Sequence, residues 1–158
     1  MQPEKTALIT GASAGIGAEF AKQLHELGYN LILIARRENL LSKITEELNK
    51  RRPNSVKFKV VDLSDKDQLN QAAEEIRSTK IDLLVNNVGR GSFGPFEELE
   101  LASEIQMVDI NIITPLVLAH AVIPQMKQRR SGVIISVSSI AAFQPLPYMA
   151  SYAATKAF

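Results

Sequence analysis

Short apolar runs alternate along the chain with longer segments in which apolar residues recur every three or four positions. The runs are rich in β-branched residues, and Gly, Pro, Asn or Asp marks most of the junctions. They predict strands over 6–10, 31–35, 56–61, 81–87 and 132–138. The amphipathic segments predict helices over about 15–27, 38–50, 66–78 and 103–129.

This alternation of strands and helices predicts an α/β fold with a doubly wound parallel sheet. Four of the five runs are nearly all apolar, as expected for strands that are covered on both faces. The run VKFKVV at 56–61 alternates instead, which predicts an outer strand with one wetter face. Pro115 and Pro124 fall within the long helix, so we expect it to bend or break there. No internal repeat, low-complexity tract or linker interrupts residues 1–158, which predicts one domain.

Composition excludes several classes of function. The chain has no cysteine, which excludes disulfides, thiolate metal sites and a cysteine nucleophile. Its two histidines, His25 and His120, are too few for a His-rich zinc site, so we expect them to be structural and expect no bound metal. A net charge of +1 without a basic patch argues against nucleic acid as a partner.

The chain also lacks obvious targeting signals. The first ten residues, MQPEKTALIT, have no apolar core of a secretory signal. No stretch reaches the ~18 uninterrupted apolar residues that cross a bilayer. We therefore expect a soluble, cytoplasmic protein with no membrane span.

The first predicted strand leads directly into TGASAGIGAEF, where Gly11, Gly15 and Gly17 stand between a strand and a helix. Glycine lets the backbone turn sharply and approach a pyrophosphate, while the helix N-terminus offers free N–H groups to the phosphates. The placement favours nucleotide binding. The alternative is a tight strand–helix turn without a ligand.

The second predicted strand ends at ARREN, and Arg36 follows Gly17 by nineteen residues. An acidic side chain at this distance would bind the ribose 2′-hydroxyl of NAD. Arg36 and Arg37 suit a phosphate instead, which favours NADP over NAD. The alternative is a pair of surface arginines at a helix start, where their charge is unfavourable.

Tyr152 and Lys156 lie four residues apart in SYAATKAF at the end of the chain. On a helix this spacing places both side chains on one face, one turn apart. An ammonium beside a phenol favours the phenolate and prepares the hydroxyl for general acid/base catalysis. The same two residues would also be ordinary on a solvated helix surface.

Together these features resemble the short-chain dehydrogenase/reductase family. The motifs follow the family's order and spacing over the whole chain: T-G-x-x-x-G-x-G at 10–17, DL at 62–63, NNVG at 86–89, Asn111, SVSS at 136–139 and YAATK at 152–156. Each motif alone is weak, whereas the set in register is specific. The resemblance implies the Rossmann-like form of the doubly wound fold.

The resemblance also implies catalytic roles. Tyr152 would be the acid/base, Lys156 its partner, and Asn111 the fourth member of the group. Ser139 would orient the substrate carbonyl, since it precedes Tyr152 by thirteen residues, the family's usual separation. Ser138 remains a plausible supporting group.

For the cofactor, the resemblance implies that Asp62 binds the adenine amino group and that Asn86 lies against the cofactor. Val88 replaces the family's commoner alanine, a mild departure. The full set of implied cofactor-binding residues is Gly11, Ser13, Gly15, Ile16, Gly17, Arg36, Arg37, Asp62, Leu63, Asn86, Asn87, Val88, Gly89, Tyr152 and Lys156.

The sequence therefore predicts an NADP-dependent oxidoreductase that transfers hydride between nicotinamide and a small-molecule carbonyl or alcohol. The resemblance implies a homodimer or homotetramer at full length. Family members are longer, so we expect these residues to be the cofactor-binding portion, truncated after strand five and the start of the catalytic helix, and inactive alone. We then expect 132–138 to form a sheet edge. The alternatives are a non-catalytic nucleotide sensor and a dimerising interaction module that uses the 103–129 helix.

Overall fold

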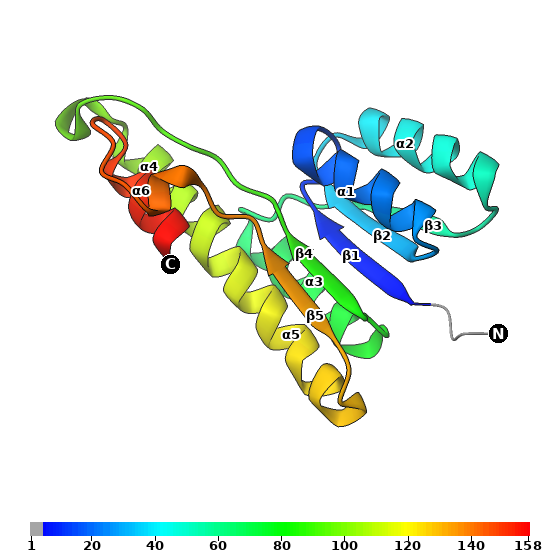
Figure 1. The fold of residues 1–158 in the computed structure, drawn as a ribbon. Coiled ribbons are helices and arrows are strands. Elements are labelled where there is room, and N and C mark those ends of the chain that lie inside the picture. The colour runs from blue at the N-terminus through cyan, green and yellow to red at the C-terminus, as the bar shows by residue number, and fades with distance from the viewer. Residues whose placement is uncertain (1–4) are drawn as a thin grey trace.

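The computed structural model describes residues 5–158 as a parallel sheet with helices on both faces (Figure 1). Its five strands lie in the order β3-β2-β1-β4-β5. The strands are β1 (Thr6–Thr10), β2 (Asn30–Ala35), β3 (Val56–Val60), β4 (Leu83–Asn86) and β5 (Val133–Ser136). The helices are α1 (Gly15–Glu26), α2 (Glu38–Arg51), α3 (Lys66–Ser78), α4 (Leu101–Val108), α5 (Thr114–Arg129) and α6 (Ala150–Ala157), with short helical turns η1 (Phe96–Glu98), η2 (Asp109–Ile113) and η3 (Ile140–Ala142). The predicted doubly wound fold is confirmed.

Alternate residues of the central strand serve two separate cores. Ala7 and Ile9 of β1 pack into the core beneath α1 and α2. Leu8, which points to the opposite face, packs into the core beneath α3 and α5. This alternation explains why the strands are nearly continuous apolar runs, since both faces of the sheet must be apolar.

The two sheet edges differ in character. β3 is one edge, as its alternating sequence predicts, and Lys57 and Lys59 help to keep that edge polar. β5 is the other edge of the described sheet, as expected for 132–138. Ile135 packs against the core, whereas Val133 is 54% exposed.

The long helix predicted over 103–129 is present, but it does not break at either proline. It begins at Leu101 and passes through a wider π-helical turn, η2, before continuing as α5. Pro115 lies in the first turn of α5, directly after η2, so the missing N–H falls next to the irregular turn. Pro124 is accommodated inside α5. A π-helical turn inside an α-helix commonly marks a functional position, and η2 contains Asn111.

The same helical stretch bears on the expectation that the chain has no membrane span. Leu101–Arg129 is long and apolar enough to cross a bilayer by length and composition, with a mean hydropathy of 1.6 in its most apolar window. Core helices of soluble proteins meet the same criteria, and 39% of that window is buried here. The absence of a span therefore stays a prediction.

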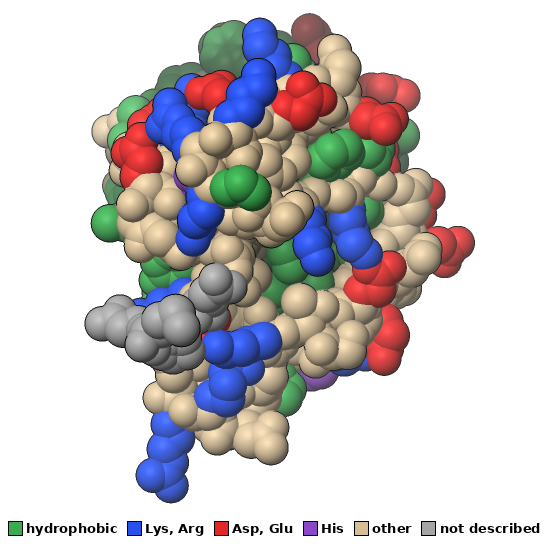
Figure 2. Space-filling model, turned by 90° about the vertical axis from the view of Figure 1, so that its right-hand side faces the viewer, with side chains coloured by type: hydrophobic (Ala, Val, Ile, Leu, Met, Phe, Trp, Pro, Cys, Tyr) green, Lys and Arg blue, Asp and Glu red, His purple; other side chains and the backbone are tan. Residues whose placement is uncertain are grey.

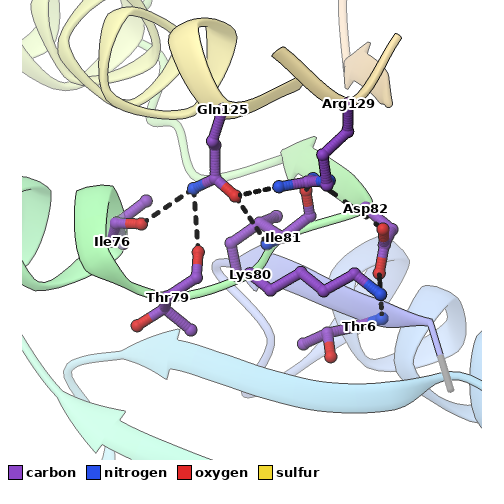
Figure 3. Close-up of polar contacts among 8 residues, drawn as sticks. All are labelled: Thr6, Ile76, Thr79, Lys80, Ile81, Asp82, Gln125 and Arg129. Carbon is purple, nitrogen blue, oxygen red and sulfur yellow. Dashed lines mark hydrogen bonds and ion pairs between the residues drawn. The ribbon is translucent and has the colours of Figure 1, made fainter. Parts of the chain in front are cut away.

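A polar network fixes the end of the sheet away from the strand carboxyl ends (Figure 3). Gln125 of α5 donates to the carbonyl oxygens of Ile76 and Thr79 at 3.0 and 2.8 Å. Its own oxygen accepts from Ile81 N at 3.1 Å, and Asp82 accepts from Thr6 N at 2.9 Å. These bonds join α5, the end of α3 and the starts of β4 and β1. The candidate site lies at the opposite end of the sheet from this network.

Charges of both signs cover the side of the molecule shown in Figure 2. Lys and Arg side chains lie among Asp and Glu side chains in the upper part of this view, while Asp and Glu are more frequent toward its right edge and Lys and Arg in its lower part. Such mixing is typical of a solvated protein surface.

Candidate active site

The turn between β1 and α1 is compact and tightly packed. Gly11 has φ +65, and a Cβ at this residue would lie 2.8 Å from Asn87 Nδ2. At Gly17 a Cβ would lie 2.5 Å from the Gly11 carbonyl oxygen. Only glycine fits at both positions, because a side chain would force the turn and the helix apart. The sharp turn predicted for these glycines is present, and their approach to a pyrophosphate stays a prediction.

The N-terminus of α1 has no side-chain cap from the described residues. Its N-cap residue is Ala14, which has no polar side chain, and the first turn of the helix contains no acidic residue. The first backbone N–H groups of a helix lack intrahelical partners. At α1 they remain available to an anion, and the helix dipole favours negative charge there.

A cleft of about 430 Å³ opens beside this turn at the carboxyl ends of β1, β2 and β4. Its lining residues are Gly11, Ser13, Ala14, Ile16, Ala35, Arg36, Arg37, Val61, Asp62, Leu63, Ser64, Asn87, Val88, Gly89, Arg90, Gln106 and Ile110. Most of the predicted cofactor-binding residues are in this set. Ile16, which lines the cleft, is 59% exposed.

The two arginines of ARREN belong to this cleft rather than to a plain helix surface. Arg37 donates to Ser13 Oγ at 3.0 Å and so returns from the end of β2 to the glycine turn. Arg36 lies 3.7 Å from Asp62. The predicted pair therefore spans the side of the cleft between the glycine turn and the end of β3.

Asp62 is held in its ionised form. Burial raises the pKa of its carboxyl group, but hydrogen bonds from the Ser64 hydroxyl and backbone N–H, together with the charge of Arg36, outweigh burial and bring the pKa below its ordinary value. A carboxylate at this place can accept a hydrogen bond from an amino group in the cleft.

The two asparagines of NNVG face different sides. Asn87 lines the cleft, and its Nδ2 donates to the Thr10 carbonyl oxygen at 2.9 Å. Asn86 is buried on the opposite side, facing a second cavity of about 250 Å³, and its Oδ1 has no partner among the described residues. Asn86 does not line this cleft, because consecutive residues at a strand end point in opposite directions. It shares the second cavity with Lys156, so its place against the cofactor stays a prediction. Gly15 and Gly17 shape the turn without lining the cleft.

Lys156 lies in α6, half-buried, and faces the second cavity. Its Nζ donates to the Val137 carbonyl oxygen at 3.0 Å, immediately after β5. Burial lowers the pKa of Lys156 from its ordinary value, because removal from water disfavours the ammonium.

The segment that follows β4 joins the cleft to α6. Gly89 lines the cleft, and a Cβ there would lie 3.2 Å from Lys156 Nζ. A Cβ at Gly91 would lie 3.4 Å from the ring of Tyr152. Gly89 therefore lies beside Lys156 and Gly91 beside Tyr152, although neither Tyr152 nor Lys156 lines the cleft itself.

Asn111 is buried in η2 and contacts the same segment. Its Oδ1 accepts from Arg90 N at 3.0 Å, and its Nδ2 donates to the Arg90 carbonyl oxygen at 2.9 Å. The structure thus brings Asn111, Lys156 and Tyr152 together around residues 89–91, as the resemblance implies.

The two candidate serines play different structural parts. Ser139 caps η3, where its Oγ accepts from Ala141 N at 3.2 Å. Ser138 donates to the Lys156 carbonyl oxygen at 2.7 Å and ties β5 to α6. Both follow β5 directly, so each lies at the carboxyl end of a strand, where ligands bind in this fold.

An aromatic pair near Tyr152 was missed by sequence reasoning. The rings of Phe93 and Tyr148 are 5.6 Å apart and meet edge to face, although both are largely exposed. Tyr148 has φ +64, an unusual conformation for a bulky residue, and its carbonyl oxygen accepts from Gly94 N at 3.0 Å. No motif signals this pair, since it depends on the path of two loops.

Residues 5–158 contain no group of three His, Asp or Glu side chains that could hold a metal ion. The groups that meet at the site are a phenol, an ammonium, hydroxyls and amides. They suit proton transfer and hydrogen bonding to an organic ligand.

Comparison with known proteins decides the family. A family model for short chain dehydrogenases matches residues 5–158. The chain belongs to the short-chain dehydrogenase family. The predicted resemblance is thereby confirmed over all the described residues.

Relatives and solved structures agree with this assignment. The chain is 36% identical over 156 residues to a very-long-chain 3-oxoacyl-CoA reductase of Laccaria bicolor, covering 96% of this chain and 46% of that protein. It matches the bulky-bulky ketone specific alcohol dehydrogenase of Comamonas testosteroni with a TM-score of 0.93 and 34% identity, covering 98% of this chain and 62% of the other. A short-chain dehydrogenase from Sphingobium yanoikuyae in complex with NADPH gives a TM-score of 0.93 and 32% identity, covering 98% and 61%. The chain spans about half the length of the curated relatives that it matches.

Proposed function

We propose that this chain is the cofactor-binding portion of an NADP-dependent oxidoreductase that transfers hydride between nicotinamide and a carbonyl or alcohol substrate. The observation that carries the proposal is the path of segment 89–91: Gly89 lines the cleft and lies beside Lys156 Nζ, and Gly91 lies beside the ring of Tyr152. A dinucleotide that fills the cleft from the end of β3 toward Gly89 would extend toward the catalytic pair.

The residues of the cleft fit NADP. The uncapped N-terminus of α1 would bind the pyrophosphate, and Asp62 would accept a hydrogen bond from the adenine amino group. Arg36 and Arg37 would bind the 2′-phosphate, since guanidinium groups match phosphate in charge and shape. The Sphingobium yanoikuyae neighbour, which was solved with NADPH, supports this choice.

Bound NADPH would supply the hydride, and the protein would supply positioning and a proton. In the direction of reduction, the carbonyl oxygen gains negative charge as hydride reaches the carbon. Tyr152 would donate its hydroxyl proton to that oxygen, and Ser139 would hydrogen-bond to it. The Lys156 ammonium would stabilise the phenolate that Tyr152 leaves behind.

The surroundings of Tyr152 favour an apolar substrate. Phe93 and Tyr148 form their edge-to-face pair on two loops, Ile140 and Phe143 lie at the two ends of η3, and each of the four is more than half exposed. Exposed apolar groups that gather at one place commonly mark a binding surface. The names of the relatives, a very-long-chain 3-oxoacyl-CoA reductase and a bulky ketone dehydrogenase, support a long acyl chain or a bulky ketone as the substrate.

We also propose a homodimer or homotetramer at full length and a cytoplasmic location. Exposed Leu101, Ile105, Val108 and Leu116 recur at helical spacing along α4–α5, which supports pairing of this helix with a second copy. Light scattering of the full-length protein tests the oligomer. Flotation with lipid vesicles tests whether the same helix associates with a membrane instead.

An assay of the full-length protein tests the proposed function. NADPH and NADH are each supplied with a panel of short ketones, bulky ketones and 3-oxoacyl-CoA thioesters of increasing chain length. We expect oxidation of NADPH in preference to NADH, with the higher kcat/KM for the larger apolar substrates. Tight NADPH binding without turnover of any carbonyl would favour the nucleotide-sensor alternative. Absence of NADPH binding would contradict the proposal.

A further inference from the structure

Helix α6 carries both candidate catalytic side chains but is too short to be stable alone. It spans eight residues, Ala150–Ala157, and isolated helices of this length are unstable in water. Contacts with the rest of the protein must therefore hold it in place. Among its described residues, Thr155 is the one that is buried, with 5% of its surface exposed.

The hydroxyl of Thr155 connects the catalytic helix to Asn111. Thr155 Oγ1 donates to the Tyr152 carbonyl oxygen at 2.8 Å and accepts from Asn111 Nδ2 at 2.9 Å. A hydroxyl has one proton to donate and lone pairs to accept, so both bonds form at once. Thr155 thus lies between the backbone of Tyr152 and the long α4–α5 helix.

The side-chain amide of Asn111 is fully engaged by protein groups. Its two N–H bonds are directed to Thr155 Oγ1 and the Arg90 carbonyl oxygen, and its oxygen accepts from Arg90 N. These bonds join η2, the segment after β4 and α6 at one point. The amide therefore holds three elements together, and its N–H groups are not free to bind a substrate.

We propose that Thr155 is a positioning residue whose hydroxyl, through Asn111, fixes α6 against segment 89–91 and so places Tyr152 and Lys156 for proton transfer. The inference rests on the proposed function. It adds a residue to which the resemblance assigns no role. Thr155 directly precedes Lys156 and follows Tyr152 by three positions, so a rotation of the helix at Thr155 displaces both.

Replacement by valine separates the hydroxyl from the shape of the side chain. Thr155→Val keeps the volume but leaves an Asn111 N–H buried without its partner. We expect kcat to fall by about tenfold, which equals about 1.4 kcal/mol in the barrier. The dissociation constant for NADPH should change less than kcat, because Thr155 does not line the cleft and acts on the cofactor only through Lys156. Thr155→Ser keeps the hydroxyl and should keep most of the activity.

The test combines amide hydrogen exchange with steady-state kinetics on the full-length wild type and these two variants. We expect Thr155→Val to exchange faster in the peptide that covers 150–157. Peptides from the opposite end of the sheet, around Gln125, should exchange as in the wild type. Thr155→Ser should exchange like the wild type throughout. Equal exchange in all three proteins would overturn the inference. It would also be overturned if α6 exchanges faster in Thr155→Val without loss of kcat, or if both variants lose kcat equally. A wild type without turnover would contradict the proposed function, while the exchange data would still show whether Thr155 anchors the helix.

Discussion

Lys156 Nζ donates a hydrogen bond to the carbonyl oxygen of Val137 over 3.0 Å. The bond connects the catalytic helix to the residue that follows β5, and it uses one of the three protons of the ammonium. The remaining two have no hydrogen-bond partner among the described residues. Because the ammonium is half-buried, its charge acts through a medium less polar than water and has a larger effect on its neighbours.

The first prediction concerns this ammonium. Replacement of Lys156 by methionine keeps much of the side-chain volume but removes the positive charge that would stabilise a Tyr152 phenolate. We expect kcat to fall by about a hundredfold at neutral pH, within the range that general acid–base groups contribute. Stopped-flow measurement of NADPH oxidation by the full-length protein checks this. Lys127→Met, an exposed change near the end of α5, is the control and should leave kcat unchanged.

The second prediction concerns the cofactor's 2′-phosphate. Arg37→Ala removes a guanidinium group that reaches Ser13 at the glycine turn. We expect the dissociation constant for NADPH to rise by at least about tenfold, since hydrogen bonds to charged groups contribute about 1.5–3 kcal/mol. Binding of NADH should hardly change, because it lacks the phosphate. Fluorescence titration with both cofactors measures the ratio of the two dissociation constants. Arg77→Ala, which changes an exposed side chain of α3, is the control.

A loss of affinity for both cofactors alike would show that Arg37 supports the turn rather than the phosphate. Tighter binding of NADH than of NADPH by the wild type would overturn the interpretation of ARREN.

The third prediction tests the uncapped N-terminus of α1. Ala14 has extended backbone angles, which suit an N-cap residue. Ala14→Asp should therefore stabilise the cofactor-free protein by about 1 kcal/mol, because the carboxylate accepts from the first N–H groups of the helix. The same carboxylate would occupy the pyrophosphate site and repel the negatively charged pyrophosphate. The free energy of unfolding, measured by urea denaturation, should therefore rise, while the affinity for NADPH, measured by titration, should fall. Unchanged NADPH affinity would show that the phosphates bind elsewhere.

The fourth prediction follows from His25, which is buried with its Nε2 2.9 Å from Ser55 Oγ. Burial lowers its pKa from the usual 6.5, and the charges of Arg52 and Arg51 add to the shift. The unfolded chain therefore binds the proton more readily than the folded protein. Stability should decrease as the pH falls below 6.5 toward the lower pKa of the folded state, and it should recover as the pH rises.

Urea denaturation from about pH 7.5 to about pH 5 measures the slope of the free energy of unfolding against pH. His25→Gln cannot take up the proton and should lose part of the pH dependence, although its stability at neutral pH falls as well. His120→Gln, on the exposed side of α5, should keep the slope of the wild type. Identical slopes in all three proteins would show that His25 does not couple folding to pH.

The strands and helices could be predicted from sequence because each follows from a local pattern. The continuous apolar runs and the alternating VKFKV strand reflect one or two buried faces, and β3 is indeed an edge. The glycine turn was equally clear, since Gly11 and Gly17 have a backbone reason to be glycine. The pattern and the positive φ of Gly11 depend on residues close together in the chain, whereas the close approach of Asn87 to both glycines does not.

Other features depend on contacts between distant residues and could not be predicted. The sequence does not show that Asn87 rather than Asn86 faces the cleft, because the exact end of β4 decides the orientation. It also gave the prolines as the cause of a bend, whereas the irregular turn is η2, just before Pro115. The bond between Asn111 and Thr155 joins residues 44 positions apart, and no pattern in either segment indicates it.

The most direct test of the account is the activity of Tyr152→Phe in the full-length protein. This change removes only the hydroxyl that is proposed to exchange a proton with the substrate. We predict a loss of kcat of at least about a hundredfold with NADPH affinity nearly unchanged. Turnover equal to that of the wild type would contradict the central claim that Tyr152 is the acid/base of this site.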